Sequence, residues 1–114
     1  MKILVCGGRD YNQKKTVFST LDMIHEDYPI KCLVHGAATG ADTLGAQWAE
    51  TREVEQKPYP ADWDRYKNAA GPIRNALMLK DNPDIELVVV FPGGRGTNNM
   101  RTKAEKAGIQ VLLV

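Results

Sequence analysis

The chain has 114 residues, of which 43% are hydrophobic and 25% are charged, and its formal net charge at pH 7 is +1. This length matches one domain, spanning residues 1–114, and no apolar run approaches the roughly 20 residues that cross a bilayer. The near-neutral charge argues against a protein that holds nucleic acid mainly through its phosphate backbone. The sequence therefore predicts one globular domain with no membrane span and disfavours nucleic acid as a partner.

Short apolar runs rich in β-branched residues alternate with longer segments of helical period, which is the βαβ pattern of a parallel sheet. In chain order, the predicted strands are Lys2–Cys6, Lys31–His35, Glu53–Lys57, Glu86–Phe91 and Gln110–Val114. The fourth run is apolar without alternation, which indicates burial on both faces. Right-handed crossovers then predict an α/β fold, a Rossmann-like three-layer αβα domain whose five-stranded parallel sheet has the order 3-2-1-4-5.

Four helices are expected between these strands, the last from about residue 98 to residue 106. Each carries apolar residues at helical spacing, so we expect each set to face the core. In chain order these sets are Val17, Leu21 and Ile24; Leu44 and Trp48; Ile73 and Leu77; and Met100, Ala104 and Ala107.

The first strand ends in Gly7 and Gly8, followed by Arg9 and Asp10. Two glycines let the backbone approach a ligand closely because no Cβ stands in the way, and Arg9 can then reach an anion. A tight turn with a solvated Arg-Asp pair explains the same residues. Gly7, Gly8 and Arg9 are candidate ligand-binding residues, and both interpretations stay open.

The second strand ends in a segment of small residues, 36–42, and the next helix begins there. Unpaired backbone amides and the positive end of a helix converge at such a point, which favours an anion. The candidate residues of this anion site are Gly36, Ala37, Thr39 and Gly40. Asp42 either caps the helix or accepts a hydrogen bond from a ribose or a base.

The connection 58–71 after the third strand is longer than most βα loops. We interpret it as a lid or specificity loop, in which Trp63 is a candidate platform for stacking a base. Arg74 and Asn75 then stand near the start of the third helix, where the helix dipole disfavours a cation. A bound phosphate would compensate Arg74, as would Asp62 or Asp64, and the fit of guanidinium to phosphate favours the ligand.

The fourth strand leads into a second glycine-rich turn directly before the last helix. Three glycines in four residues disfavour folding, because glycine loses more conformational entropy on folding than any other residue. Such a cluster therefore indicates a specific role. A hydroxyl at the end of the turn caps the helix or binds a phosphate oxygen. The turn therefore predicts a phosphate cradle at a helix N-terminus. Its candidate residues are Gly93, Gly94, Arg95, Gly96 and Thr97.

Metal and nucleophile chemistry has little support in the sequence. Cys6 and Cys32 lie in apolar strand runs, where a free thiol behaves as a small hydrophobe, and a reducing cytoplasm fits them best. His35 ends a strand, but no second histidine or cysteine lies at metal-ligand spacing. We therefore expect no metal and no cofactor. No Ser-His-Asp order or Walker lysine motif is present, so catalytic residues stay unassigned.

The glycine-rich segments resemble those of the SLOG superfamily, named for Smf/DprA and LOG proteins, and most closely its small YspA/YpsA-related branch. Residues 92–97 (PGGRGT) resemble the PGGxGTxxE motif of LOG-type phosphoribohydrolases, whose loop grips a nucleotide phosphate. Residues 74–78 (RNALM) resemble their RKxxM segment, and residues 36–42 are similar to the GLAxGID segment of DprA proteins, which bind single-stranded DNA. The resemblance implies a nucleotide-binding domain, and the related families often dimerise through helices flanking the sheet.

One position departs from the LOG motif, because the glutamate that acts in catalysis there is Met100 here. A thioether cannot act as an acid, a base or a carboxylate stabiliser. The favoured function is a binding domain that senses or processes a nucleotide or nucleotide-derived signal. A LOG-like N-glycosidase that uses Asp42, Asp62, Asp64 or Asp10 instead of the glutamate is the alternative. A DprA-like single-stranded DNA binder is weaker, because the net charge is only +1.

Overall fold

In the computed structural model, which describes residues 1–114, five strands pair in parallel in the order β3-β2-β1-β4-β5. Their bounds are β1 Lys2–Cys6, β2 Cys32–His35, β3 Glu55–Pro58, β4 Leu87–Val90 and β5 Gln110–Leu113. The predicted topology is confirmed. The third strand begins two residues later than predicted, because Glu53 has a φ of +57° and the Val54 N–H donates to the Ala49 carbonyl. These two residues thus belong to the turn that ends the preceding helix.

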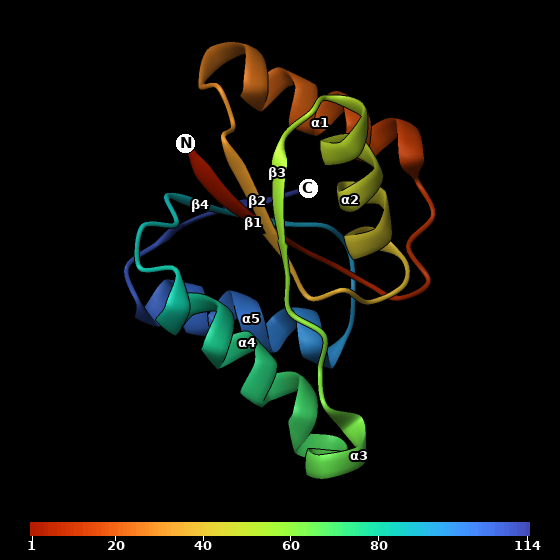
Figure 1. Cartoon of the computed structure of the whole chain (residues 1–114), viewed down its shortest axis with the longest axis vertical. Coiled ribbons are helices and arrows are strands. Elements are labelled where there is room, and N and C mark those ends of the chain that lie inside the picture. The colour runs from red at the N-terminus through yellow and green to blue at the C-terminus, as the bar shows by residue number, and fades with distance from the viewer.

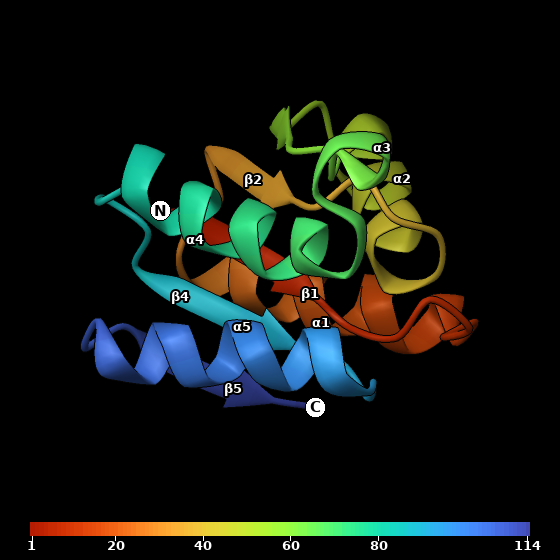
Figure 2. The same ribbon diagram turned by 90° about the horizontal axis from the view of Figure 1, so that it is seen from below.

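Helices cover both faces of the sheet, as Figure 1 shows. The helices α1 (Lys14–Asp27) and α2 (Ala41–Thr51) lie on one face, and α4 (Ala70–Asp81) and α5 (Arg95–Lys106) lie side by side on the other (Figures 1 and 2). Between β3 and α4 the chain forms a short helix, α3 (Trp63–Tyr66), and a 3-10 turn, η1 (Lys67–Ala69). None of these helices combines the length and apolar character needed to span a bilayer.

Alternate residues of β1 face opposite layers, as the two-residue period of a strand requires. Ile3 and Val5 pack under α1 and α2, whereas Leu4 and Cys6 pack under α4 and α5. The first core also contains Val17, Leu21, Leu33, Trp48, Val89 and Phe91. The second also contains Val34, Met78, Val88, Val90, Met100 and Ala104. All four residues of β4 are buried, as predicted for a strand covered on both faces.

The apolar stripe predicted for the third helix is wrong. Ile73 is 41% exposed and Leu77 is 44% exposed, whereas Asn75 and Met78 are buried. The buried face of this helix includes a glycine, an asparagine and a methionine. The spacing of its apolar residues therefore predicted the solvent-exposed face as the buried one. Ala107, predicted to share the buried face of the last helix, is also exposed, because α5 ends at Lys106.

Two adjacent residues of α4 provide a matched test of which side is buried. Met78→Ala should lower the free energy of unfolding by about 2–5 kcal/mol, because it empties part of the core. Leu77→Ala should lower it by less than about 1 kcal/mol, because its side chain is largely solvated. Urea unfolding followed by circular dichroism measures both. Equal losses for the two variants would show that Leu77 is a core residue after all.

Candidate functional site

Backbone hydrogen bonds join the loops after β1, β2 and β4 into one surface at the carboxyl edge of the sheet. The Gly8 N–H donates to the Pro92 carbonyl at 2.8 Å, and the Ala41 N–H donates to the Gly8 carbonyl at 3.1 Å. The Thr39 hydroxyl donates to the Arg9 carbonyl at 3.2 Å. Because β1 lies between β2 and β4, its loop is held from both sides. The Thr39 hydroxyl, a predicted ligand contact, thus serves to fix the Arg9 loop.

These loops, together with α3 and the start of α4, surround a cavity of about 550 Å³. Every predicted ligand-binding residue lines it except Ala37, Thr39, Gly40 and Gly93. The first two of these line an adjoining hollow of about 340 Å³. Sequence reasoning missed Asn99, which also lines the cavity. It lies three residues after Gly96 and therefore on the same helix face. This spacing could have identified Asn99 only if the helix had been predicted to begin at Arg95.

Several loop glycines are required by packing between the loops. A Cβ on Gly7 would lie 2.6 Å from the Ala41 Cβ, and one on Gly93 would lie 2.6 Å from the Gly8 nitrogen. Gly40 has a φ of +76°, which side chains disfavour, and its Cβ would overlap the Gly8 carbonyl. These positions would need glycine even in a protein without a ligand.

Gly94 and Gly96 differ from the other glycines, because no atom lies within 4 Å of a Cβ built on either of them. Gly94 has a φ of −103° and a ψ of −138°, which lies beyond the extended region that side chains prefer. Both residues line the cavity. Packing therefore does not require glycine at these two positions.

The N-terminus of α5 lies at the cavity without a side-chain cap. The helix begins at Arg95, three residues earlier than predicted, and its first backbone bond runs from the Asn98 N–H to the Gly94 carbonyl at 3.0 Å. Thr97 is the third helical residue and does not cap it, and the first turn contains no acid. The amides of Arg95, Gly96 and Thr97 thus precede the hydrogen-bond ladder, at the positive end of the helix dipole.

Arg74 lies in the second turn of α4, not at its start, and its half-buried guanidinium reaches back to the loop after β2. Nη1 donates to the Gly36 carbonyl and to the Tyr59 carbonyl (3.4 Å), and Nε donates to Asn75 Oδ1 at 3.0 Å. Burial lowers the pKa of Arg74, and the nearby carboxylate of Asp42 opposes that shift. A Cβ on Gly36 would overlap this guanidinium, so the glycine makes room for Arg74.

Asn75 is buried, and its three hydrogen bonds all stay within the protein. Its Oδ1 accepts from Arg74, and its Nδ2 donates to the Gly96 carbonyl at 3.2 Å and to Asn99 Oδ1 at 3.1 Å. Asn75 was predicted to contact ligand. In the structure it lines the cavity and also links Arg74 to Gly96 in the first turn of α5.

Asp42 occupies the place where the sequence predicted an anion cradle. Its Oδ2 accepts from the Gly36 N–H at 3.1 Å and from the Ala38 N–H at 3.3 Å, and the Ala37 N–H donates to His35 Nδ1 at 3.0 Å. In the structure these three amides are bound by the protein's own side chains, and the amides of Thr39 and Gly40 are the part of the predicted cradle that has no such partner. Asp42 is 6% exposed and is the only acidic residue that lines the cavity. Burial raises its pKa, and the loop amides, His35 and Arg74 partly oppose that shift.

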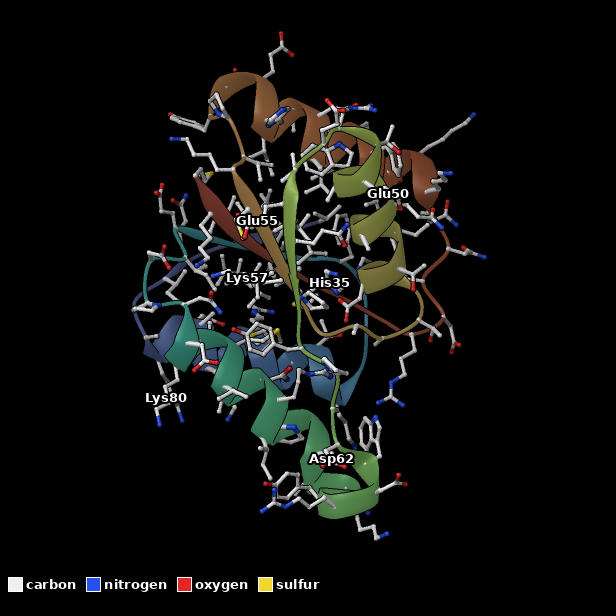
Figure 3. All side chains as sticks on the ribbon, in the orientation of Figure 1. His35, Glu50, Glu55, Lys57, Asp62 and Lys80 are labelled. Carbon is white, nitrogen blue, oxygen red and sulfur yellow. The ribbon has the colours of Figure 1, made fainter.

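The aspartates of the long connection have other roles. Asp62 caps α3 by accepting from the Arg65 N–H at 3.2 Å, and Figure 3 shows it on this peripheral segment. Neither Asp62 nor Asp64 forms an ion pair with Arg74. Trp63 is 43% exposed, and the Arg9 guanidinium lies 4.7 Å from its ring centroid. The arginine and the aromatic ring thus meet at the mouth of the cavity.

His35 lies at the end of β2 (Figure 3), and both of its ring nitrogens form hydrogen bonds. Its Nδ1 accepts from the Ala37 N–H, so Nε2 carries the proton and donates to Gln56 Oε1 at 3.2 Å. The structure contains no group of three or more histidine, cysteine, aspartate or glutamate side chains arranged to hold a metal ion. Cys6 lines the cavity as a free thiol, and burial raises its pKa to about 12.

Three comparisons place these features among known proteins. A model of the YspA, cpYpsA-related SLOG family matches residues 1–66. The gene 61 protein of Mycobacterium phage D29 is 34% identical over 119 residues, which cover 97% of this chain and 94% of that protein. The X-ray structure of DNA processing protein A (DprA) from Streptococcus pneumoniae matches with a TM-score of 0.78 and 17% identity, over 98% of this chain and 49% of that one. The last likeness shows the Rossmann-like fold, and this chain spans about half of DprA.

The burial of Asp42 predicts a pH-dependent gain in stability for Asp42→Asn. The pKa of Asp42 is raised on folding from an ordinary value of 3.8, so its ionised form is disfavoured in the folded protein. Wild type therefore loses stability relative to the variant as the pH rises above about 3.8, until the folded carboxyl is also ionised. At pH 7 the variant should therefore melt at a higher temperature than wild type.

Thermal unfolding of both proteins between pH 3.5 and pH 8 measures this difference. A difference that did not grow between low and neutral pH would contradict the raised pKa.

Proposed function

The chain belongs to the YspA, cpYpsA-related SLOG family, and on this basis we propose that it binds a nucleotide or nucleotide-derived ligand in the cavity at the carboxyl edge of its sheet. The observation that carries the proposal is the uncapped N-terminus of α5. Its amides, free of any acid in the first turn, face a cavity that Arg9 and Arg74 also line. Helix amides and guanidinium groups together are the usual protein partners of phosphate.

In this proposal, different sides of the cavity bind different parts of the nucleotide. The phosphate would bind the amides of Arg95, Gly96 and Thr97, with Arg74 as its cation. The bare Cα atoms of Gly94 and Gly96 would let it approach the backbone. Trp63 at the mouth offers an aromatic face to a base, since base–aromatic stacking is favourable for every base.

An N-glycosidase of the LOG type is the second candidate, and one observation favours it. Asp42 is an acid within the cavity, so a carboxylate is available there even though the motif glutamate is missing. Met100, which replaces that glutamate, is fully buried in the core under α4 and α5. Asp10, Asp62 and Asp64 do not line the cavity, so Asp42 is the one replacement that stays open.

Incubation with AMP, GMP, CMP and UMP separates the binding domain from the enzyme. We expect chromatography to show no release of free base, because the carboxylate of the motif is absent and Met100 cannot replace it. Release of base by wild type, lost in Asp42→Asn, would establish the N-glycosidase instead.

A substitution at Gly94 tests the phosphate site itself. Asp at this position would cap α5, and its Cβ meets open space, whereas the ψ of −138° at Gly94 opposes the few tenths of a kcal/mol that the cap contributes. The stability of Gly94→Asp should therefore stay within about 1 kcal/mol of wild type. Its carboxylate would repel the phosphate and occupy the amides. Affinity for the tightest-binding nucleotide of the panel should fall about a hundredfold or more.

Gly94→Asn is the matched control, because it has the same shape and cap chemistry without the charge. Calorimetric titration and thermal melting of both variants supply the measurements. Equal affinities for the Asp and Asn variants would rule out the N-terminus of α5 as the phosphate site.

A further inference from the structure

Asp42 carries a carboxylate oxygen that neither the fold nor the phosphate site uses. Its Oδ2 is held by the Gly36 and Ala38 amides, whereas Oδ1 makes no hydrogen bond within the protein. Asn82 Oδ1 is the only fully buried side-chain nitrogen or oxygen atom that lacks a hydrogen-bond partner. Asp42 Oδ1 also lacks a partner, so it is not fully buried and solvent reaches it. Asp42 lines the cavity and is 6% exposed, so a ligand in the cavity is the partner available to this oxygen.

Resting on the proposed function, we infer that Asp42 Oδ1 accepts a hydrogen bond from a sugar hydroxyl, so that the site selects ribonucleotides over their deoxy counterparts. An ionised carboxylate only accepts hydrogen bonds, and it repels a phosphate. The part of a nucleotide that meets this oxygen is therefore a hydrogen-bond donor and not the phosphate. With the phosphate at α5 and the base at Trp63, the part of a nucleotide left between them is the ribose.

The structural role of Asp42 does not explain the choice of a carboxylate. Asp42 fixes the loop after β2 through one oxygen, and an asparagine would offer the same oxygen to the same two amides. The second oxygen of the carboxylate adds a buried charge beside an apolar core, and such a charge disfavours folding. A residue that opposes folding and points into a cavity is typical of a binding site.

Asp42→Asn changes the chemistry at one atom. The amide oxygen would accept from Gly36 and Ala38, which leaves the NH₂ group facing the cavity. The variant thus replaces a hydrogen-bond acceptor by a donor while the loop keeps its contacts. Because the change also removes a charge, the comparison is made as a ratio of affinities, in which effects on the phosphate cancel.

The experiment is calorimetric titration of wild type and Asp42→Asn with AMP, GMP, CMP and UMP and with the 2′-deoxy and 3′-deoxy forms of the tightest binder. In wild type, at least one deoxy form should bind about tenfold or more weakly than the ribonucleotide, as expected for a lost hydrogen bond to a charged group. In Asp42→Asn the same ratio should fall to within about threefold. Thermal melting confirms that the variant is folded.

Two results would overturn the inference and leave the proposed function standing. One is a wild type that binds the ribonucleotide and both deoxy forms equally well, with all binding lost in Gly94→Asp. The other is an Asp42→Asn variant that keeps the wild-type ratio. If wild type binds none of the nucleotides, the proposed function fails, and this inference fails with it.

Discussion

Gly36 is the residue that links the buried carboxylate of Asp42 to the half-buried guanidinium of Arg74, and the geometry of the cavity depends on this link. Its N–H donates to Asp42, and its carbonyl accepts from Arg74. The two side chains form no direct ion pair, so each is held by the backbone between them. A side chain at position 36 would overlap Arg74 and crowd the carboxylate. Position 36 must therefore be glycine. The next residue, Ala37, has a left-handed φ of +55°, and the loop bends around the Asp42 carboxylate.

The same link organises the opposite wall of the cavity. Arg74 is braced by Asn75, and Asn75 in turn holds the Gly96 carbonyl in the first turn of α5 and the Asn99 side chain in the second. A continuous set of hydrogen bonds thus runs from the loop after β2 to the helix that follows β4. Arg74 also bonds the Tyr59 carbonyl after β3. The positions of the cation and of the uncapped helix end are consequently set by one network.

The sequence was sufficient for the topology and for locating the loops of the site, because both follow from local patterns. Apolar β-branched runs mark buried strands, and glycine-rich ends of strands one, two and four meet wherever crossovers are right-handed. The roles within the site were not predictable in the same way. Whether a glycine is required by packing depends on residues that are distant in sequence. Gly36, for example, must be glycine because the guanidinium of Arg74 lies against it. The buried face of α4 was missed for a related reason, since its Asn75 is polar and is buried because it has partners on α5.

The position of Met100 shows how the family motif separates into a structural and a chemical part. The residues from Pro92 to Thr97 still form a turn and an uncapped helix start, which need only backbone geometry and packing. Met100, where the LOG-type motif has its glutamate, lies in the core under α4 and α5, where a methionine packs well and a carboxylate would need a buried partner. The one acid left in the cavity comes from α2, on the opposite side of Arg74. The turn and the acid therefore come from different elements, so a change in one leaves the backbone of the other in place.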